Sequence, residues 1–149
     1  MTRADGRVVP EWDYPKPHLV TLEVLAADID AYQHVNNSVY LSWFDRVAWS
    51  HSAALGISLD ECVRIRRGMA AHRSEIDYLR AAVLGDQVQV ATWIVNSDGK
   101  LRVERRFQVR HVARAETLAR ARIEYVCINL DSGRAARMPE SFVACYLAG

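Results

Sequence analysis

The sequence predicts an α+β fold in which a five-stranded antiparallel sheet wraps around one long central helix. One strand pattern comes first, a strongly apolar helix pattern follows it, and four more strand patterns come after, joined mostly by short turns. Strands that follow one another through short turns pair antiparallel. A single sheet buries such an apolar helix most economically by curling around it.

The composition is that of an ordinary globular protein. The chain has 149 residues, of which 50% are apolar and 25% are charged, so we expect one domain with a real core. The formal net charge of +1 argues against nucleic-acid binding. Cys62, Cys127 and Cys145 form no Cys-x-x-Cys pair, so we expect reduced thiols. There is no long apolar run and no leader pattern, so we expect a cytoplasmic protein that binds no membrane.

The first strand is predicted after an N-terminal arm. Residues 1–17 hold three of the four prolines and show no periodicity, so we assign residues 18–149 to a single domain. Apolar and polar side chains then alternate across residues 20–26, which is typical of a strand with one buried face.

The central helix is predicted from apolar residues at three- and four-residue steps between Val39 and Leu55. Ser38 or Asn37 can cap its beginning, and Gly56 can end it. Such a helix is roughly 25 Å long. Four bulky aromatic residues within ten positions favour contacts on more than one side: Tyr40, Trp43, Phe44 and Trp49.

Alternating patterns and turn residues predict the rest of the sheet. The four later strands are expected at residues 70–79, 87–96, 101–110 and 117–129. A hairpin turn is predicted at residues 97–100, a closing turn at 131–134 and a short terminal helix near 141–147. Residues 59–67 are basic and weakly periodic, and no element is predicted there. Trp93 falls on the face away from the helix, so we expect another subunit to cover part of that face.

Polar residues gather between the first strand and the helix: Asp28, Asp30, His34, Asn36 and Asn37. Each of them alone is explained by a turn or a cap. Together they suggest more, because a helix that begins near Asn37 offers unpaired backbone N–H groups and the positive end of its dipole. Those groups can stabilise an oxyanion while an upstream carboxylate faces the same point. The arrangement fits acyl transfer, with an aspartate as general base or nucleophile.

Other chemistries find less support in the sequence. It contains no Gly-x-Ser-x-Gly elbow and no glycine pattern for nucleotide phosphates. The histidines lack the spacing of a catalytic metal site, so we expect neither a metal nor a cofactor. Arginines recur along the strand predicted at 101–110, at positions 102, 105, 106 and 110. They are most simply solvated, although such a run could also meet phosphates at the mouth of a cleft.

Residues 28–45 resemble the signature of hotdog-fold acyl-CoA thioesterases, in the branch of 4-hydroxybenzoyl-CoA thioesterase and the YbgC/FadM-like enzymes. Residues 75–86 look like the family's strand and turn, and residues 119–125 and 133–139 look like its last strand and closing segment. The resemblance implies the hotdog fold and hydrolysis of an acyl-CoA thioester. It also implies sites formed between two subunits, hence a dimer or tetramer.

The resemblance also implies roles for individual residues. It places catalysis on Asp30, as general base or nucleophile, and carbonyl polarisation on the backbone amide at Asn37. Asp28, His34 and Asn36 match the motif and are expected to position the loop and the substrate.

More distant positions would complete the substrate site. Tyr40 is expected near the acyl group. Lys100 is the best candidate for contact with the phosphates of coenzyme A, and Arg102 and Arg134 are weaker candidates. Coenzyme A enters only as part of the substrate.

Two positions depart from the family pattern. Gln33 stands where glycine is usual before His-Val-Asn-Asn, so the loop lacks glycine's freedom at positive φ. Ala81 replaces a proline and loosens a turn. Because hotdog domains also host other functions, two alternatives stay open. One is a non-catalytic module that binds an acyl or aromatic ligand, and the other is an acyl-carrier-protein thioesterase.

Overall fold

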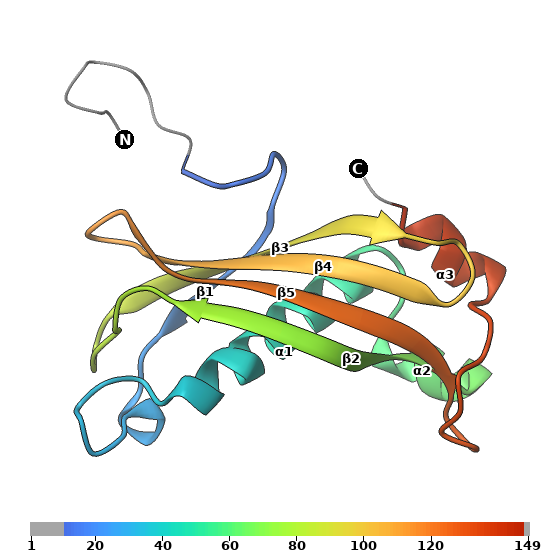
Figure 1. The fold of residues 1–149 in the computed structure, drawn as a ribbon, viewed down its shortest axis with the longest axis horizontal. Helices are drawn as coiled ribbons and strands as arrows, with labels where there is room; N and C mark the ends of the chain where they lie inside the picture. Colours follow the sequence, from blue (N-terminus) through green and yellow to red (C-terminus); the bar gives the residue numbers. More distant parts are fainter. Residues whose placement is uncertain (1–10, 148–149) are drawn as a thin grey trace.

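Five antiparallel strands form one sheet around a long helix, as the sequence predicts (Figure 1). The computed structural model describes residues 11–147, and the strand order is β1-β3-β4-β5-β2. The strands are β1 (His18–Glu23), β2 (Arg67–Tyr78), β3 (Gln87–Ser97), β4 (Arg102–His111) and β5 (Glu116–Asn129). The helices are the 3-10 turn η1 (Ala26–Asp28), α1 (Asn37–Ala54), α2 (Leu59–Ile65) and α3 (Glu140–Cys145).

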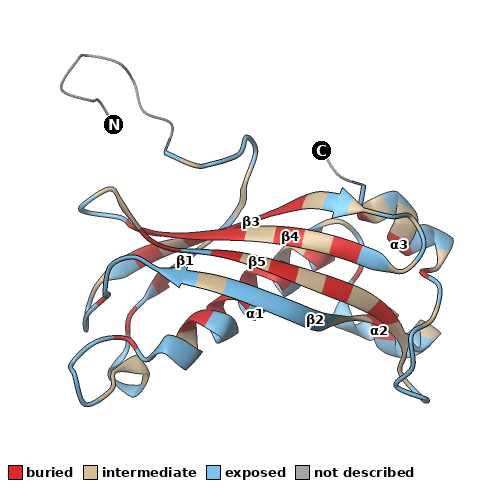
Figure 2. Cartoon of the chain, in the orientation of Figure 1, coloured by how far each residue is buried: buried red, intermediate tan, exposed pale blue. Residues whose placement is uncertain are grey.

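The core lies between α1 and the concave face of the sheet. Phe44 and Val47 of α1 are fully buried, and the Phe44 ring lies 4.9 Å from that of Phe107 on β4. Burial of one such side chain contributes roughly 1.5–3 kcal/mol. Figure 2 shows β3, β4 and β5 as largely buried, whereas β2 at one edge of the sheet is mostly exposed. Gly56 follows α1 with a φ of 101°, a conformation that suits its predicted role in ending the helix.

Residues 59–67, for which no element is predicted, contain the helix α2. The Ser58 hydroxyl oxygen accepts a hydrogen bond from the Glu61 N–H (3.1 Å), and acidic residues fill the first turn. Cys62 is the one buried residue of this helix, so α2 has almost no apolar stripe. This explains the weak periodicity. Arg66 ends the helix in the left-handed conformation, with a φ of 56°.

Part of the outer face of the sheet is covered by the chain's own N-terminal segment. Residues 11–17 cross this face, and Trp93 is only 6% exposed. The Trp93 indole N–H donates to the Pro15 carbonyl (3.1 Å), and the rings of Trp12 and Tyr14 pack against it. The cover of Trp93 itself is therefore supplied by the arm of the same chain. Residues 1–10, the first part of the predicted arm, lie outside the described residues.

Two of the arginines that the sequence suggests are solvated are in fact buried. Arg110 is 4% exposed and lies under Trp12, where its guanidinium donates to the Ala115 carbonyl (2.6 Å). Arg105 is 3% exposed and faces α1, because strand alternation places it on the same side as Val103 and Phe107.

Neutral acceptors surround Arg105. Its guanidinium donates to the hydroxyl of Ser52 (3.1 Å) and to Nδ1 of His51 (2.8 Å). Since arginine can only donate, Nδ1 of His51 must carry the lone pair and the ring is neutral. Burial, then the charge of Arg105 and then His18, lowers the pKa of His51 from 6.5 to about 4.

We predict that His51 makes the protein less stable in weak acid. Between pH 6.5 and about 4 the unfolded chain protonates this ring and the folded chain does not, so the free energy of unfolding falls as the pH falls. The expected slope is up to about 1.4 kcal/mol per pH unit. Urea denaturation at several pH values measures it. The His51→Gln variant, which keeps an acceptor for Arg105, should show a flatter dependence, and identical slopes would contradict the assignment.

Candidate active site

The polar segment between η1 and α1 folds as a tight hairpin-like loop. The Asp30 N–H donates to the His34 carbonyl (2.9 Å), and an isolated bridge joins Ile29 to Val35. Val35 is buried, and its N–H donates to the Ala82 carbonyl (2.9 Å). The loop is thus anchored through its one buried residue while its polar side chains stay near the surface.

One oxygen of the Asp30 carboxylate is held in place. Oδ1 accepts a hydrogen bond from the Tyr32 N–H (2.9 Å), as aspartates do when they stabilise a turn. In the part of the chain that the structure describes, no hydrogen bond uses Oδ2. The side chain is half-buried. An oriented carboxylate with a free oxygen can take a proton or attack an electrophile.

The start of α1 presents an unused backbone donor. Asn36 is the N-cap, and its Oδ1 accepts from both the N–H (2.9 Å) and the hydroxyl (2.9 Å) of Ser38. The cap is therefore Asn36, not Ser38 or Asn37 as the sequence suggests, whereas the predicted helix start near Asn37 is confirmed. None of the hydrogen bonds among residues 11–147 uses the N–H of Asn37. It points out of the first turn, where the helix dipole is positive.

Neighbouring side chains hold this geometry. Asp28 accepts from the Leu25 N–H through Oδ2 (2.9 Å), and its carbonyl accepts from the Asn36 N–H (2.9 Å). The Tyr78 hydroxyl of β2 donates to the Asn37 carbonyl (3.1 Å), and its ring packs edge-on against Tyr40 (5.2 Å). Tyr40 is itself only 3% exposed, so it supports the helix start from within the core. The His34 side chain is exposed at the loop surface.

Residues 24–145 match the thioesterase-like superfamily, which is most of the chain. The chain belongs to this superfamily. Long-chain acyl-CoA thioesterase FadM of Escherichia coli (strain K12) is 26% identical over 121 residues, covering 76% of this chain and 85% of FadM. The prediction of a thioester hydrolase is confirmed at the level of the family.

Solved structures confirm the hotdog fold of this thioesterase. A 1,4-dihydroxy-2-naphthoyl-CoA thioesterase from Synechocystis has a TM-score of 0.78 at 21% identity, covering 88% of this chain and 96% of its own. A Staphylococcus aureus protein in complex with CoA has a TM-score of 0.80 at 22% identity, covering 87% of this chain and 81% of its own. At such identities the likeness establishes the fold alone.

The basic residues proposed for coenzyme A lie far from the Asp30 loop of the thioesterase. Lys100 and Arg102 lie at the β3–β4 hairpin and Arg134 in the turn after β5, at the opposite end of α1 (Figure 1). The 18 residues of α1 span about 27 Å. One protomer therefore brings Asp28, Asp30, His34, Asn36, Asn37 and Tyr40 together but leaves these three basic residues apart.

Gln33 adopts the conformation that favours glycine, with a φ of 64°. A residue with a side chain pays roughly 1–2 kcal/mol to adopt this left-handed conformation. Glycine avoids that cost, but its greater loss of conformational entropy on folding costs about 0.5–1 kcal/mol. We therefore expect Gln33→Gly to raise the free energy of unfolding of the thioesterase by up to about 1 kcal/mol. Urea denaturation measures the change. Gln33→Ala keeps a Cβ and serves as the control, so equal stability of the two variants would argue against strain at this position.

None of the helices in residues 11–147 is both long and apolar enough to cross a membrane. Within the same residues, no group of three or more His, Cys, Asp or Glu side chains could hold a metal ion.

Proposed function

We propose that the protein hydrolyses an acyl-CoA thioester to the free acid and coenzyme A at the start of α1. One observation carries the proposal: an aspartate with a free carboxylate oxygen lies in the loop that leads to an unused N–H at Asn37. The Ile29–Val35 bridge ties together the two segments that carry these groups. The relationship to FadM supports an acyl-CoA as the substrate.

The backbone amide of Asn37 polarises the thioester carbonyl. As the carbonyl carbon is attacked, negative charge moves to its oxygen, and a fixed N–H with the helix dipole behind it stabilises that charge. A single donor of this kind accelerates comparable reactions by about 100- to 1000-fold. Asn36 keeps the amide in place by capping α1, and Tyr78 does so by bonding the Asn37 carbonyl.

Asp30 brings about the attack on the carbonyl carbon, by one of two routes. As a general base it takes a proton from water, and the resulting hydroxide adds to the carbonyl carbon. As a nucleophile it adds directly and forms an anhydride, which water then hydrolyses. In both routes the carbon–sulfur bond breaks and coenzyme A leaves as a thiolate that gains a proton. Asp28 and His34 position the loop and the substrate, and Tyr40 lies beneath the acyl group.

The coenzyme A moiety is held by basic residues of a second subunit. Because Lys100 and Arg102 lie at the far end of α1 from Asp30, one protomer does not supply both halves of the site. The self-associated protein, as a dimer or tetramer, brings them together. The CoA complex of the Staphylococcus aureus structural relative supports a coenzyme A site on this fold.

A panel of thioesters tests the proposal. Release of free coenzyme A is measured with short, long and aromatic acyl-CoAs and with the same acyl groups on an acyl carrier protein. We expect release from at least one class of acyl-CoA. Measurable binding without release from any member would favour a non-catalytic ligand-binding module. Release only from carrier-linked substrates would favour an acyl-carrier-protein thioesterase.

A further inference from the structure

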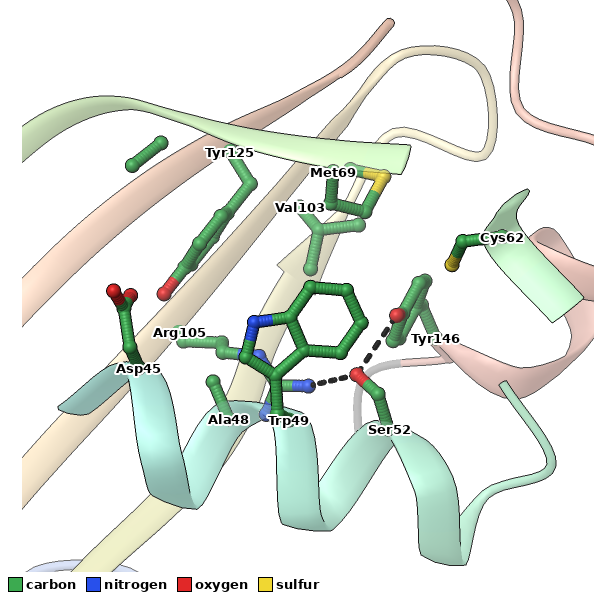
Figure 3. Close-up of a pocket in the computed structure, with 11 residues that line it drawn as sticks. Asp45, Ala48, Trp49, Ser52, Cys62, Met69, Val103, Arg105, Tyr125 and Tyr146 are labelled. Atoms are coloured by element: carbon green, nitrogen blue, oxygen red, sulfur yellow. Dashed lines mark hydrogen bonds between the residues drawn. The ribbon is translucent and has the colours of Figure 1, made fainter. Parts of the chain in front are cut away.

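A separate cavity of about 290 Å³ lies between α1 and strands β2, β4 and β5 (Figure 3). It opens beside the middle and the C-terminal half of α1, away from the Asp30 loop. Its walls include Asp45, Trp49, Ser52, Met69, Arg105 and Tyr125. None of these residues takes part in the proposed hydrolysis, so the cavity is distinct from the candidate active site.

Among the described residues, the buried guanidinium of Arg105 has no counter-ion. Among residues 11–147, no ion pair includes this side chain, although it is only 3% exposed. Its partners are neutral: the hydroxyls of Ser52 and Thr92, the ring of His51 and the face of the Tyr146 ring. They leave part of its donor capacity unused. Burial of a charge is costly unless an opposite charge compensates it, so this site favours an anion.

The Tyr125 hydroxyl is a second unused polar group at the same cavity. Tyr125 is 8% exposed, and its hydroxyl has no hydrogen-bond partner within the described residues. Buried polar groups normally have partners, so an unpaired hydroxyl in a cavity wall is available to a polar group of a ligand. Trp49 and Met69 add apolar surface to the cavity wall (Figure 3).

Among the described residues, Asp45 is the one carboxylate in the cavity wall, and it limits how an anion can bind. It is exposed and lies on the Tyr125 side of the cavity (Figure 3). On α1 it precedes Ser52, a partner of Arg105, by two turns, which is about 10 Å. Repulsion from an exposed carboxylate at that distance is screened by water, whereas attraction to the buried Arg105 is much less so. An anion is therefore expected at the Arg105 end.

We propose that this cavity binds the carboxylate of a small apolar carboxylic acid, with Arg105 as the charged partner. The apolar part of the ligand lies against Trp49 and Met69, and the Tyr125 hydroxyl is a further donor. The carboxylate could be presented by a free acid or at the far end of an acyl group attached to coenzyme A. The second source, unlike the first, rests on the proposed hydrolase function.

Calorimetric titration of the full chain with hexanoate tests the proposal without any catalysis. Hexanamide has the same shape but no charge, and we expect it to bind roughly tenfold or more weakly. The Arg105→Met variant should lose hexanoate binding by a similar factor. Arg106→Met, on the same strand but on the outer face, is the matched control and should bind hexanoate like the wild type. Circular dichroism checks that each variant is folded.

Equal affinity of the wild type for hexanoate and hexanamide, or no binding of hexanoate, would overturn the proposal even if Arg105→Met does not fold. A folded Arg105→Met variant that binds hexanoate as well as the wild type would also overturn it. Tyr125→Phe removes one donor only, so it should weaken hexanoate binding less than Arg105→Met does.

A comparison of adipoyl-CoA with hexanoyl-CoA separates the two sources of the carboxylate. If the acyl group delivers it, the ratio of kcat/KM for the two substrates should shift toward hexanoyl-CoA in Arg105→Met. If that ratio is unchanged while hexanoate binding is lost, the ligand is a free acid. Absence of coenzyme A release from every acyl-CoA would count against the proposed hydrolysis and leave the hexanoate titrations as the test of the cavity.

Discussion

Replacement of Asp30 by asparagine is expected to lower kcat for acyl-CoA hydrolysis by about 100- to 10,000-fold. The amide still offers an oxygen to the Tyr32 N–H, so the loop should keep its shape. It can neither take a proton from water nor attack the thioester, which removes both routes open to the carboxylate. Detection of the released thiol under saturating acyl-CoA measures kcat, and calorimetry with the same acyl-CoA measures binding, which should change little.

Asp60→Asn provides the matched control for this substitution. Asp60 is an exposed carboxylate in the first turn of α2, so it lies near a helix start as Asp30 does but outside the proposed site. We expect wild-type turnover from this variant. Unchanged hydrolysis by a folded Asp30→Asn protein would remove Asp30 from the mechanism.

The architecture could be predicted from the sequence because its signals are local and redundant. The helix period from Val39 to Leu55, the alternation along each strand and the turn at residues 97–100 all agree with one arrangement. The helix start near Asn37 could be predicted for the same reason. The capping residue could not be predicted, since Asn36, Asn37 and Ser38 are all good capping residues and only the backbone conformation distinguishes them.

The sequence also held a signal for the buried Arg105. Alternation places it in register with Val103 and Phe107, which face α1. The usual preference of arginine for solvent outweighed that register in the prediction. By contrast, the cover of Trp93 by residues 11–17 depends on the path of an aperiodic segment across the sheet. No local pattern encodes such a path.

The separation of Lys100 and Arg102 from Asp30 could not be predicted from the sequence either. It follows from the strand order β1-β3-β4-β5-β2 and from the length of α1, which together place the β3–β4 hairpin at the end opposite the loop. The order in which strands pair is a property of the whole sheet, and periodicity within each strand does not determine it.

Replacement of Asn37 by proline removes the backbone donor at the start of α1 together with the asparagine side chain. Proline is favoured at the first position of a helix, where its missing N–H has no helical partner. The preceding residue Asn36 already has φ −59° and ψ 137°, the conformation that proline requires before it. The Asn37 side chain is exposed, so the substitution should leave the fold intact. Circular dichroism and thermal unfolding check this.

The most direct test of the role of the Asn37 N–H is the kcat of Asn37→Pro compared with that of Asn37→Ala. Both variants lose the asparagine side chain, but only proline loses the N–H. We expect Asn37→Ala to hydrolyse acyl-CoA at nearly the wild-type rate and Asn37→Pro to be slower by about 100- to 1000-fold. Equal kcat values for the two folded variants would contradict the assignment of the Asn37 amide as the group that polarises the thioester carbonyl.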